Sequence, residues 1–321
     1  MAKPSRYIEM VLPNQRPETH PLNLIGIMPA KRTDMMMKML KSMGFSRSLI
    51  LGAMLSCASA PVAFAHGPHG HSSAAEARYI ANEGVLISQG KTKIMFDPLP
   101  LSGFGTYADV PQATIAKIMA GEGAYAGVDA VFISHAHRDH FSAKNMIAYM
   151  QAHRKVRLIA PKQALDAMQE HSNWNARLLK RITAIELEAG DAPQTIKLRN
   201  INATAVRIPH AGWPAPARAA VQNIVFRVTL GKKATVMHMG DADPNPIHFE
   251  THAEHWQSAR TDTAFPPYWF FVSEEGQSIL SNDINADKAI GVHVPLKVPQ
   301  KLKDSGADYF SVFEETRKVG E

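Results

Sequence analysis

Cysteine is almost absent from this sequence, which has a single one, Cys57, among 321 residues. A framework of disulfide bonds within the chain is therefore excluded, since each bond needs two thiols. Long apolar runs are absent as well. The run from Leu49 to Leu55 is too short, and its surroundings too rich in Ser, Gly and Pro, for a membrane-spanning helix.

A large excess of charge is also absent once the N-terminal segment is set apart. The whole chain has a formal net charge of +6, from 35 basic and 29 acidic residues. Residues 1–65 contain 8 of the basic and 3 of the acidic residues, which leaves residues 66–321 close to neutral. We therefore expect no nucleic-acid partner. The composition, 45% hydrophobic and 20% charged, is that of a globular protein and not of a disordered or fibrous one.

Residues 35–65 have the three parts of a secretory signal peptide in the usual order. Basic residues from Lys38 to Arg47 come first, the short apolar run follows, and Ala63-Phe64-Ala65 offers the small residues of a cleavage site. We therefore expect a periplasmic or secreted protein, cleaved after Ala65, with no stable membrane span in the mature chain. A buried N-terminal helix is the alternative.

The rest of the N-terminal region carries alternatives of its own. Residues 1–34 precede the signal and would be an over-extended N-terminus, with the true start codon further along the chain. Leu55-Ser56-Cys57-Ala58 faintly resembles a lipoprotein cleavage box, so lipidation of Cys57 is a minor alternative to cleavage after Ala65. Residues 66–77 would form a flexible, His-rich tail, which either captures divalent metal or is a plain polar tract.

From residue 78 onward, strand-like and helix-like patterns alternate without a long linker or an internal repeat. Short apolar runs indicate strands, and helix-like periodicity indicates helices. We expect strands at 85–87, 93–96, 130–133, 156–159, 182–187, 203–208, 224–230, 234–237 and 289–292, and helices at 145–151, 162–170 and 253–260. These elements predict a single α/β or α+β domain over residues 78–321.

The strongest chemical signal is Ser134-His135-Ala136-His137-Arg138-Asp139-His140, which directly follows the apolar strand at 130–133. Alternate residues of an extended segment share a side, so His135 and His137 can bind one metal ion together. Asp139 and His140 lie further along the turn and would face a second ion. A polar surface loop with coincidental histidines is a weaker explanation, because a buried strand leads straight into these ligand-type side chains.

His-x-His-x-Asp-His after an apolar strand resembles the signature of the metallo-β-lactamase-fold superfamily, and the resemblance extends over residues 78–295. It implies a four-layer αβ/βα sandwich with a two-metal site between the sheets. On this resemblance, His210 completes the first metal site, Asp241 bridges the two ions and His293 completes the second site. Asp97 matches the acidic residue that supports the ligands, and it would orient a histidine through the ring nitrogen remote from the metal.

The implied cofactor is a pair of divalent metal ions. Imidazole and carboxylate ligands suit Zn²⁺, which is the first expectation, and they also suit Mn²⁺ or Fe. Two such ions share a water, lower its pKa toward about 7 and clamp the substrate oxygen. Asp139 would be a metal ligand and also the catalytic proton carrier.

Aromatic residues near the implied site are candidates for the pocket wall. Trp213, Tyr268 and Trp269 each lie just beyond a strand-like segment, at the edge where the superfamily builds its substrate loops. Burial in the core is the alternative for them. As pocket walls they would favour a small, partly apolar organic substrate.

The other histidines are assigned to packing or to the surface. His238 is expected to be a packed strand residue near the site. His248 and His252 stand four residues apart and could bind metal on a helix. Because the implied ligand set is already complete, we expect these two and His255 to lie on a solvated helical face.

The resemblance implies an exported, dinuclear metal-dependent hydrolase that uses metal-bound hydroxide on a small ester, lactone, amide or phosphoester. The motifs are most similar to the single-domain branch related to ascorbate-phosphate lactonase. A true β-lactamase is less favoured, since those enzymes usually lack the bridging aspartate that Asp241 supplies. The alternative from another class is a non-catalytic metal-binding or partner-binding protein of the same fold.

Overall fold

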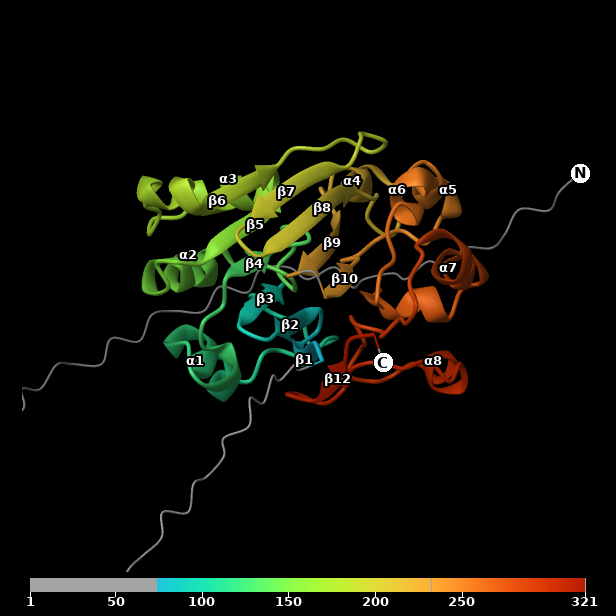
Figure 1. The fold of residues 1–321 in the computed structure, drawn as a ribbon, viewed down its shortest axis with the longest axis horizontal. Coiled ribbons are helices and arrows are strands. Elements are labelled where there is room, and N and C mark those ends of the chain that lie inside the picture. Colours follow the sequence, from blue (N-terminus) through green and yellow to red (C-terminus); the bar gives the residue numbers. More distant parts are fainter. Residues whose placement is uncertain (1–73, 232, 321) are drawn as a thin grey trace, which may run out of the picture. The chain divides into compact units, whose positions relative to one another are not determined.

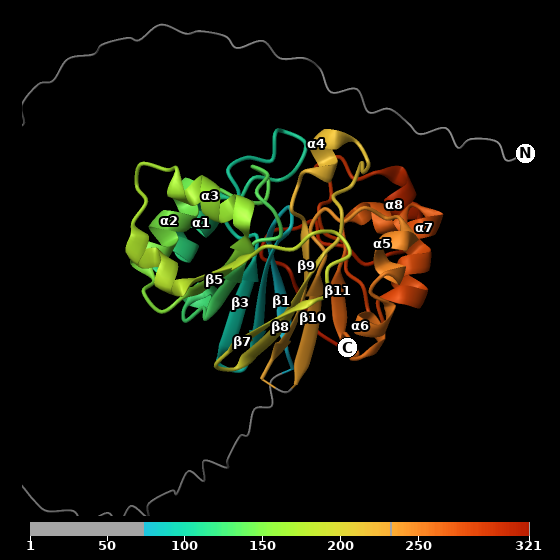
Figure 2. The ribbon, with the colours of Figure 1, turned by 90° about the horizontal axis from the view of Figure 1, so that it is seen from above.

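The computed structural model describes residues 74–231 and 233–320. In this part of the chain two β-sheets face one another, and helices lie on the outer face of each sheet (Figure 1 and Figure 2). This confirms the four-layer αβ/βα sandwich of the metallo-β-lactamase type. The predicted signal peptide, and the predicted tail up to residue 73, lie outside the described residues.

The first sheet has seven strands in the order β12-β1-β2-β3-β4-β5-β6. Its strands are β1 (Glu76–Ala81), β2 (Gly84–Gln89), β3 (Thr92–Phe96), β4 (Ala130–Phe132), β5 (Arg157–Pro161), β6 (Ile182–Ile185) and β12 (Thr316–Lys318). The strands from β12 to β3 pair antiparallel, whereas β3, β4, β5 and β6 run parallel. A parallel strand is covered on both faces, which explains why β4 is wholly apolar.

The second sheet has five strands in the order β11-β10-β9-β8-β7. They are β7 (Gln194–Leu198), β8 (Ile201–Arg207), β9 (Ile224–Leu230), β10 (Ala234–His238) and β11 (Thr263–Phe265). The strands from β7 to β10 pair antiparallel, and β11 runs parallel to β10. As a result β8, β10 and β11 all end at the same edge of this sheet.

The helices form the two outer layers. Their bounds are α1 (Gln112–Ala120), α2 (Ala143–Ala152), α3 (Lys162–Gln169), α4 (Pro216–Ala219), α5 (Pro246–Glu250), α6 (Ala253–Gln257), α7 (Glu274–Ser278) and α8 (Gln300–Asp304). Figure 2 shows α1, α2 and α3 beside the first sheet and α5, α6, α7 and α8 beside the second. Among the described residues, no helix is long and apolar enough to cross a membrane.

Alternation along the strands separates the cores of the sandwich. Phe132 of β4 faces the core between the sheets, where its ring centroid lies 5.2 Å from that of Phe226 on β9. Its neighbours Val131 and Ile133 face the other way, into the core that includes Met150 of α2. A third core lies between the second sheet and its own helices. Each buried side chain of this size contributes roughly 1.5–3 kcal/mol, so the pattern fixes which face of β4 meets which layer.

The structure confirms most of the predicted strands and corrects several boundaries. The predicted strands at 85–87 and 93–96 are β2 and β3, which pair antiparallel across a turn at Gly90, where φ is +58°. The expected strand at 289–292 is wrong, because Ala289 and Val292 form only isolated bridges. The expected helix at 253–260 ends at Gln257. The unpredicted strands and α-helices of the described part are β1, β7, β11, β12, α1, α4, α5, α7 and α8.

Candidate metal centre

All the predicted ligands follow strand ends at one edge of the sandwich. The motif that begins at His135 follows β4, His210 follows β8, and Asp241 follows β10. His293 comes directly after Val292, which bridges to Pro267 beyond the end of β11. The backbone N–H of Ile224, at the start of β9, donates to the carbonyl of Ser134 at 2.9 Å and ties the two sheets together here.

The first set of ligand atoms comes from three imidazoles and one carboxylate. His137 Nδ1 lies 3.1 Å from His135 Nε2 and 3.2 Å from His210 Nε2. Oδ2 of Asp241 lies 3.1 Å from His210 Nε2 and 3.9 Å from His135 Nε2. These four atoms all lie within 4.8 Å of one another. Four donor atoms of these types are enough to hold one metal ion.

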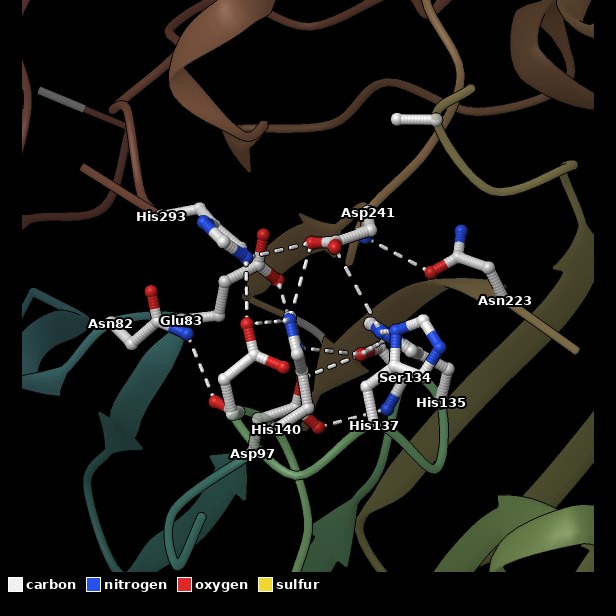
Figure 3. Close-up of polar contacts among 12 residues, drawn as sticks. Asn82, Glu83, Asp97, Ser134, His135, His137, His140, Asn223, Asp241 and His293 are labelled. Carbon is white, nitrogen blue, oxygen red and sulfur yellow. Dashed lines mark hydrogen bonds and ion pairs between the residues drawn. The ribbon is translucent and has the colours of Figure 1, made fainter. Parts of the chain in front are cut away.

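The second set uses the other oxygen of the same carboxylate. Oδ1 of Asp241 lies 3.2 Å from His140 Nε2 and 3.1 Å from His293 Nε2 (Figure 3). Asp139 Oδ2 lies 3.4 Å from His293 Nε2 and 3.8 Å from His140 Nε2. Asp241 therefore presents one oxygen to each set, which is the geometry of a bridging ligand.

Three ligand atoms of the second set are buried polar atoms without a hydrogen-bond partner in the described part of the chain. They are His140 Nε2, Asp241 Oδ1 and His293 Nε2, and all three are inaccessible. Leaving such a group unsatisfied costs about 1–3 kcal/mol, and more when it is charged. A divalent cation would satisfy all three, so the residues present fit a second metal ion.

Asp97, the predicted supporting acid, makes the contacts that orient two of the imidazoles. Its Oδ2 accepts from His140 Nδ1 at 2.9 Å and from the Ser134 hydroxyl at 2.5 Å, while its Oδ1 accepts from the Ser134 backbone N–H at 2.8 Å. The Ser134 hydroxyl lies 3.1 Å from His135 Nδ1. His140 and His135 therefore keep their protons on Nδ1 and direct Nε2 toward the metal positions.

Protonation differs between the two sets. Burial lowers the pKa of His135 well below its usual range, and burial together with His210 lowers the pKa of His137 to about 4. Both are thus neutral, as a ligand must be. Burial also opposes the charging of His293, but Asp241 and Asp139 raise its pKa to about 9. The same negative charge attracts a divalent cation, which competes with that proton.

Close approach of the backbone fixes the loop that carries Asp241. Gly240 has a φ of +52°, and a Cβ there would lie 2.5 Å from Asn223 Oδ1 and 2.6 Å from Ser134 Cβ. Asn223 is fully buried, and its Oδ1 accepts from the Asp241 backbone N–H at 3.0 Å. Two non-glycine residues of the site, Asp97 and His293, also have positive φ values, of 38° and 56°. Such strain is tolerated where surrounding contacts hold the backbone.

Three residues near the second set were missed by the sequence analysis. Asn82 and Glu83, in the turn between β1 and β2, are both buried. The Asn82 side chain donates to the Asp139 main-chain carbonyl at 2.9 Å. The main-chain carbonyl of Asn82 accepts from the His293 backbone N–H at 3.0 Å. Tyr107 lies edge-on to the His293 ring, with centroids 3.9 Å apart. In the sequence, Tyr107 is distinguished only by its place shortly before α1, a helix that was not predicted. No sequence pattern singles out Asn82 or Glu83.

The three predicted wall residues occupy different positions. Trp269 is half-buried, donates from Nε1 to the Ala242 carbonyl at 3.0 Å and has its ring centroid 5.3 Å from that of His293. Tyr268 packs edge-on against Trp269 at 5.6 Å. Trp213 is 41% exposed and lines, with Pro209 beside His210, a cavity of about 270 Å³. Trp269 thus lies beside His293 of the second ligand set, and Trp213 lies near His210 of the first.

The remaining histidines depart from the expected solvated face. His248 belongs to α5, and its Nε2 lies 3.7 Å from Asp243 Oδ1. His252 lies outside that helix, at the start of α6, and is buried. The expectation is wrong for His252 because this residue is buried, and both rings line the same cavity as Trp213. His238 is fully buried and stacks on Phe96 at 4.7 Å, as expected of a packed strand residue.

Comparison with known proteins adds a family and two similar structures. The family model described as the β-lactamase superfamily domain matches residues 92–302. A search of curated proteins finds no match. A possible metal-dependent hydrolase from Veillonella parvula DSM 2008 is similar in structure, with a TM-score of 0.52 and 13% identity, over 77% of this chain and 100% of that one. The isothiocyanate hydrolase from Delia radicum gut bacteria has a TM-score of 0.51 and 12% identity, over 76% and 99%.

At such identities the structural likeness shows the fold alone. The family match carries more, because residues 92–302 make up more than half of the chain and contain every predicted metal ligand, from His135 to His293. The sandwich topology and the shared edge of the ligands agree with it. The chain therefore belongs to the β-lactamase superfamily and has the metallo-β-lactamase fold that its histidine motif predicted.

Proposed function

We propose that this protein is an exported hydrolase that uses two divalent metal ions to cleave a small ester, lactone, amide or phosphoester with water. The observation that carries the proposal is the position of Asp241, whose two oxygens each face a separate set of buried ligand atoms. A protein that only stored metal would have no need of a shared carboxylate between two sets.

The residues of the centre have different roles in hydrolysis. Two divalent ions held there would acidify a water molecule and polarise the substrate oxygen. Asp139 lies beside the second set and accepts the proton of the attacking water. Although burial acts in the other direction, the neighbouring imidazoles of His293, 3.4 Å away, and His140 lower the pKa of Asp139, so its carboxylate is ionised and can accept that proton.

Zinc is the metal that we propose for the first position. Three imidazole nitrogens and one carboxylate oxygen converge there, and this mixture suits Zn²⁺ well. Asp97 and Ser134 fix the orientation of His135 from the side away from the metal. Such outer contacts raise the basicity of the ligand and limit its rotation.

The substrate that fits this site is small and partly apolar. Trp269 and Tyr107 both pack against the His293 ring, so one side of the centre is aromatic. Trp213 and Ile247, which are 41% and 55% exposed, line the cavity next to His210 on the other side. Side chains of this kind bind an alkyl or aryl group better than a highly charged one.

Metal analysis and a substrate panel test the proposal together. We expect two divalent ions per chain in the purified protein, and hydrolysis of at least one class among lactones, carboxylesters, phosphodiesters and β-lactams. A chelator should abolish that hydrolysis, and added Zn²⁺ should restore it. Two bound ions without hydrolysis of any class would favour the metal-binding alternative, and preferential cleavage of β-lactams would favour a true β-lactamase.

The proposal of export has its own test. We expect protein recovered from its native host to begin at His66, because the segment before it has the order of a signal peptide and Ala63-Phe64-Ala65 is its cleavage site. N-terminal sequencing and intact mass of the periplasmic and secreted fractions check this. A mature chain that still contains Met35, or one that carries a lipid on Cys57, would contradict it.

A further inference from the structure

Glu83 is a buried carboxylate that the proposed chemistry does not use. It lies in the turn between β1 and β2, and its exposed fraction is 0%. Neither of its carboxylate oxygens has a hydrogen-bond partner in the described structure. Burial raises the pKa of Glu83 well above its usual range, and acidic side chains are almost never fully buried unless they are paired, so an ionised Glu83 needs positive charge nearby.

The two imidazoles nearest to Glu83 do not supply that partner. His140 Nδ1 lies 3.8 Å from Glu83 Oε2, but its proton already points to Asp97 at 2.9 Å. His238 Nε2 lies 3.4 Å from the same oxygen, yet it bonds to the main-chain carbonyl of Glu83 at 3.0 Å. Burial also lowers the pKa of His238, which keeps that ring neutral. Neither ring therefore donates a hydrogen bond to the Glu83 carboxylate.

A cation at the second metal position would place positive charge next to Glu83. Glu83 offers a carboxylate oxygen within 4.8 Å of ligand atoms of both Asp241 and His293. Figure 3 shows the Glu83 side chain reaching between His293 and His140, on the inner side of the centre. In the same turn, Asn82 holds the backbone of Asp139 and of His293. The turn thus contacts three of the four ligands of this position.

The turn has no freedom to move Glu83 away. A Cβ at Gly84 would lie 2.9 Å from the Ala81 carbonyl oxygen and 3.2 Å from that of Asp97. The backbone of the turn is therefore packed directly against the strand end that carries Asp97. This packing holds the backbone of Glu83 beside the second metal position.

We propose that Glu83 is the residue that balances the charge of the second metal ion from beneath the site, and so determines how tightly that ion is held. The inference rests on the proposed two-metal centre and adds to it a group outside the predicted ligand set. Glu83 acts through its negative charge at short range, in a buried environment where such interactions are strong. It is a positioning residue and makes no contact with the substrate.

A metal titration of the purified protein tests this role. The variants are Glu83→Gln, which removes the charge and keeps the shape, and Glu83→Asp, which keeps the charge. Glu122→Gln removes an exposed carboxylate and is the matched control. In competition with a chromophoric chelator for Zn²⁺, we expect Glu83→Gln to bind the second ion about 10–100-fold more weakly and the first ion as wild type does. Glu83→Asp should recover part of that affinity, and the control should match wild type.

Thermal unfolding with and without Zn²⁺ separates this role from a structural one. Without metal, an unpaired buried carboxylate is costly, so Glu83→Gln should unfold at the same temperature as wild type or higher. With metal, the same variant should gain less stability than wild type does. A lower unfolding temperature in both conditions, or unchanged affinity for the second ion, would overturn the inference.

The outcome for wild type separates the inference from the proposed function. Wild type that binds two ions but hydrolyses nothing would refute the proposed reaction, while the effect of Glu83→Gln on the second ion would still support the inference. Wild type that binds a single ion under excess metal would overturn the two-ion centre and the role of Glu83 with it.

Discussion

Replacement of Asp241 by alanine is expected to leave the protein with at most one tightly bound metal ion and no measurable hydrolysis. Its two oxygens are the atoms that both sets share, at 3.1 Å from His210 Nε2 and 3.1 Å from His293 Nε2. Residues that only orient a ligand cost about 10–100-fold in metal affinity when removed, and a bridging ligand should cost more than about 100-fold. The second position should empty first, because it has two imidazoles where the first has three.

Elemental analysis after dialysis against a weak chelator measures this loss. Asp166→Ala is the matched control, since Asp166 lies on the exposed side of α3 and pairs only with Lys162. A surface pair of this kind contributes about 0–1 kcal/mol, so the control should retain both ions. Two tightly bound ions in the Asp241→Ala variant would contradict the bridging role.

Conversion of Asp139 to asparagine should have the opposite signature, with the metal largely kept and catalysis lost. The amide oxygen can still face the second position but cannot accept a proton. General-base catalysis contributes typically 10²–10⁴-fold, and we expect kcat to fall within about that range. The measurement is kcat on the substrate found in the panel, together with the metal content of the same sample.

The comparison of Asp139→Asn with Asp139→Ala gives the control for metal loss. Alanine removes the oxygen as well, so the second ion should be weakened further and KM should change along with kcat. Hydrolysis in ¹⁸O-labelled water should place the label in the product without a labelled protein side chain, because the proposed nucleophile is water and residues 66–321 contain no thiol. Full activity of Asp139→Asn, or a covalently modified residue, would contradict this mechanism.

The sequence was most informative where the required pattern is local. Four ligand-type residues between His135 and His140 follow an apolar strand, and both the strand and the ligand run fall within a dozen residues. Alternation in β4 is equally local, since the side of each residue follows from the pleat. The fold class followed from this motif and its superfamily, more than from the strand pattern. Of the missed strands, β1, β7 and β12 have mixed polar and apolar patterns because one or both faces are partly exposed, and β11 is fully buried but only three residues long.

Pairing across the sheets was beyond the reach of local patterns. The expected strand at 289–292 has a suitable composition, yet only single bridges form there, because that segment crosses the ends of other strands and does not run along one. The expected solvated face at His252 failed for a similar reason. His252 lies between the end of α5 and the start of α6, and its ring is buried. The residue pattern over 253–260 does not indicate that one helix ends and another begins there.

By itself, then, the sequence determined the superfamily, the identity of the ligand-type residues and the near-neutral charge of residues 66–321. The resemblance had already implied that Asp241 bridges the two sets. The tertiary structure alone decided that Tyr107 packs on His293 and that the turn at Asn82 and Glu83 lies beneath the second set of ligands. The physical reason is burial. A glutamate in a tight turn between strands has the sequence pattern of a solvated residue. Only the packing of distant strand ends around Glu83 removes its carboxyl group from water.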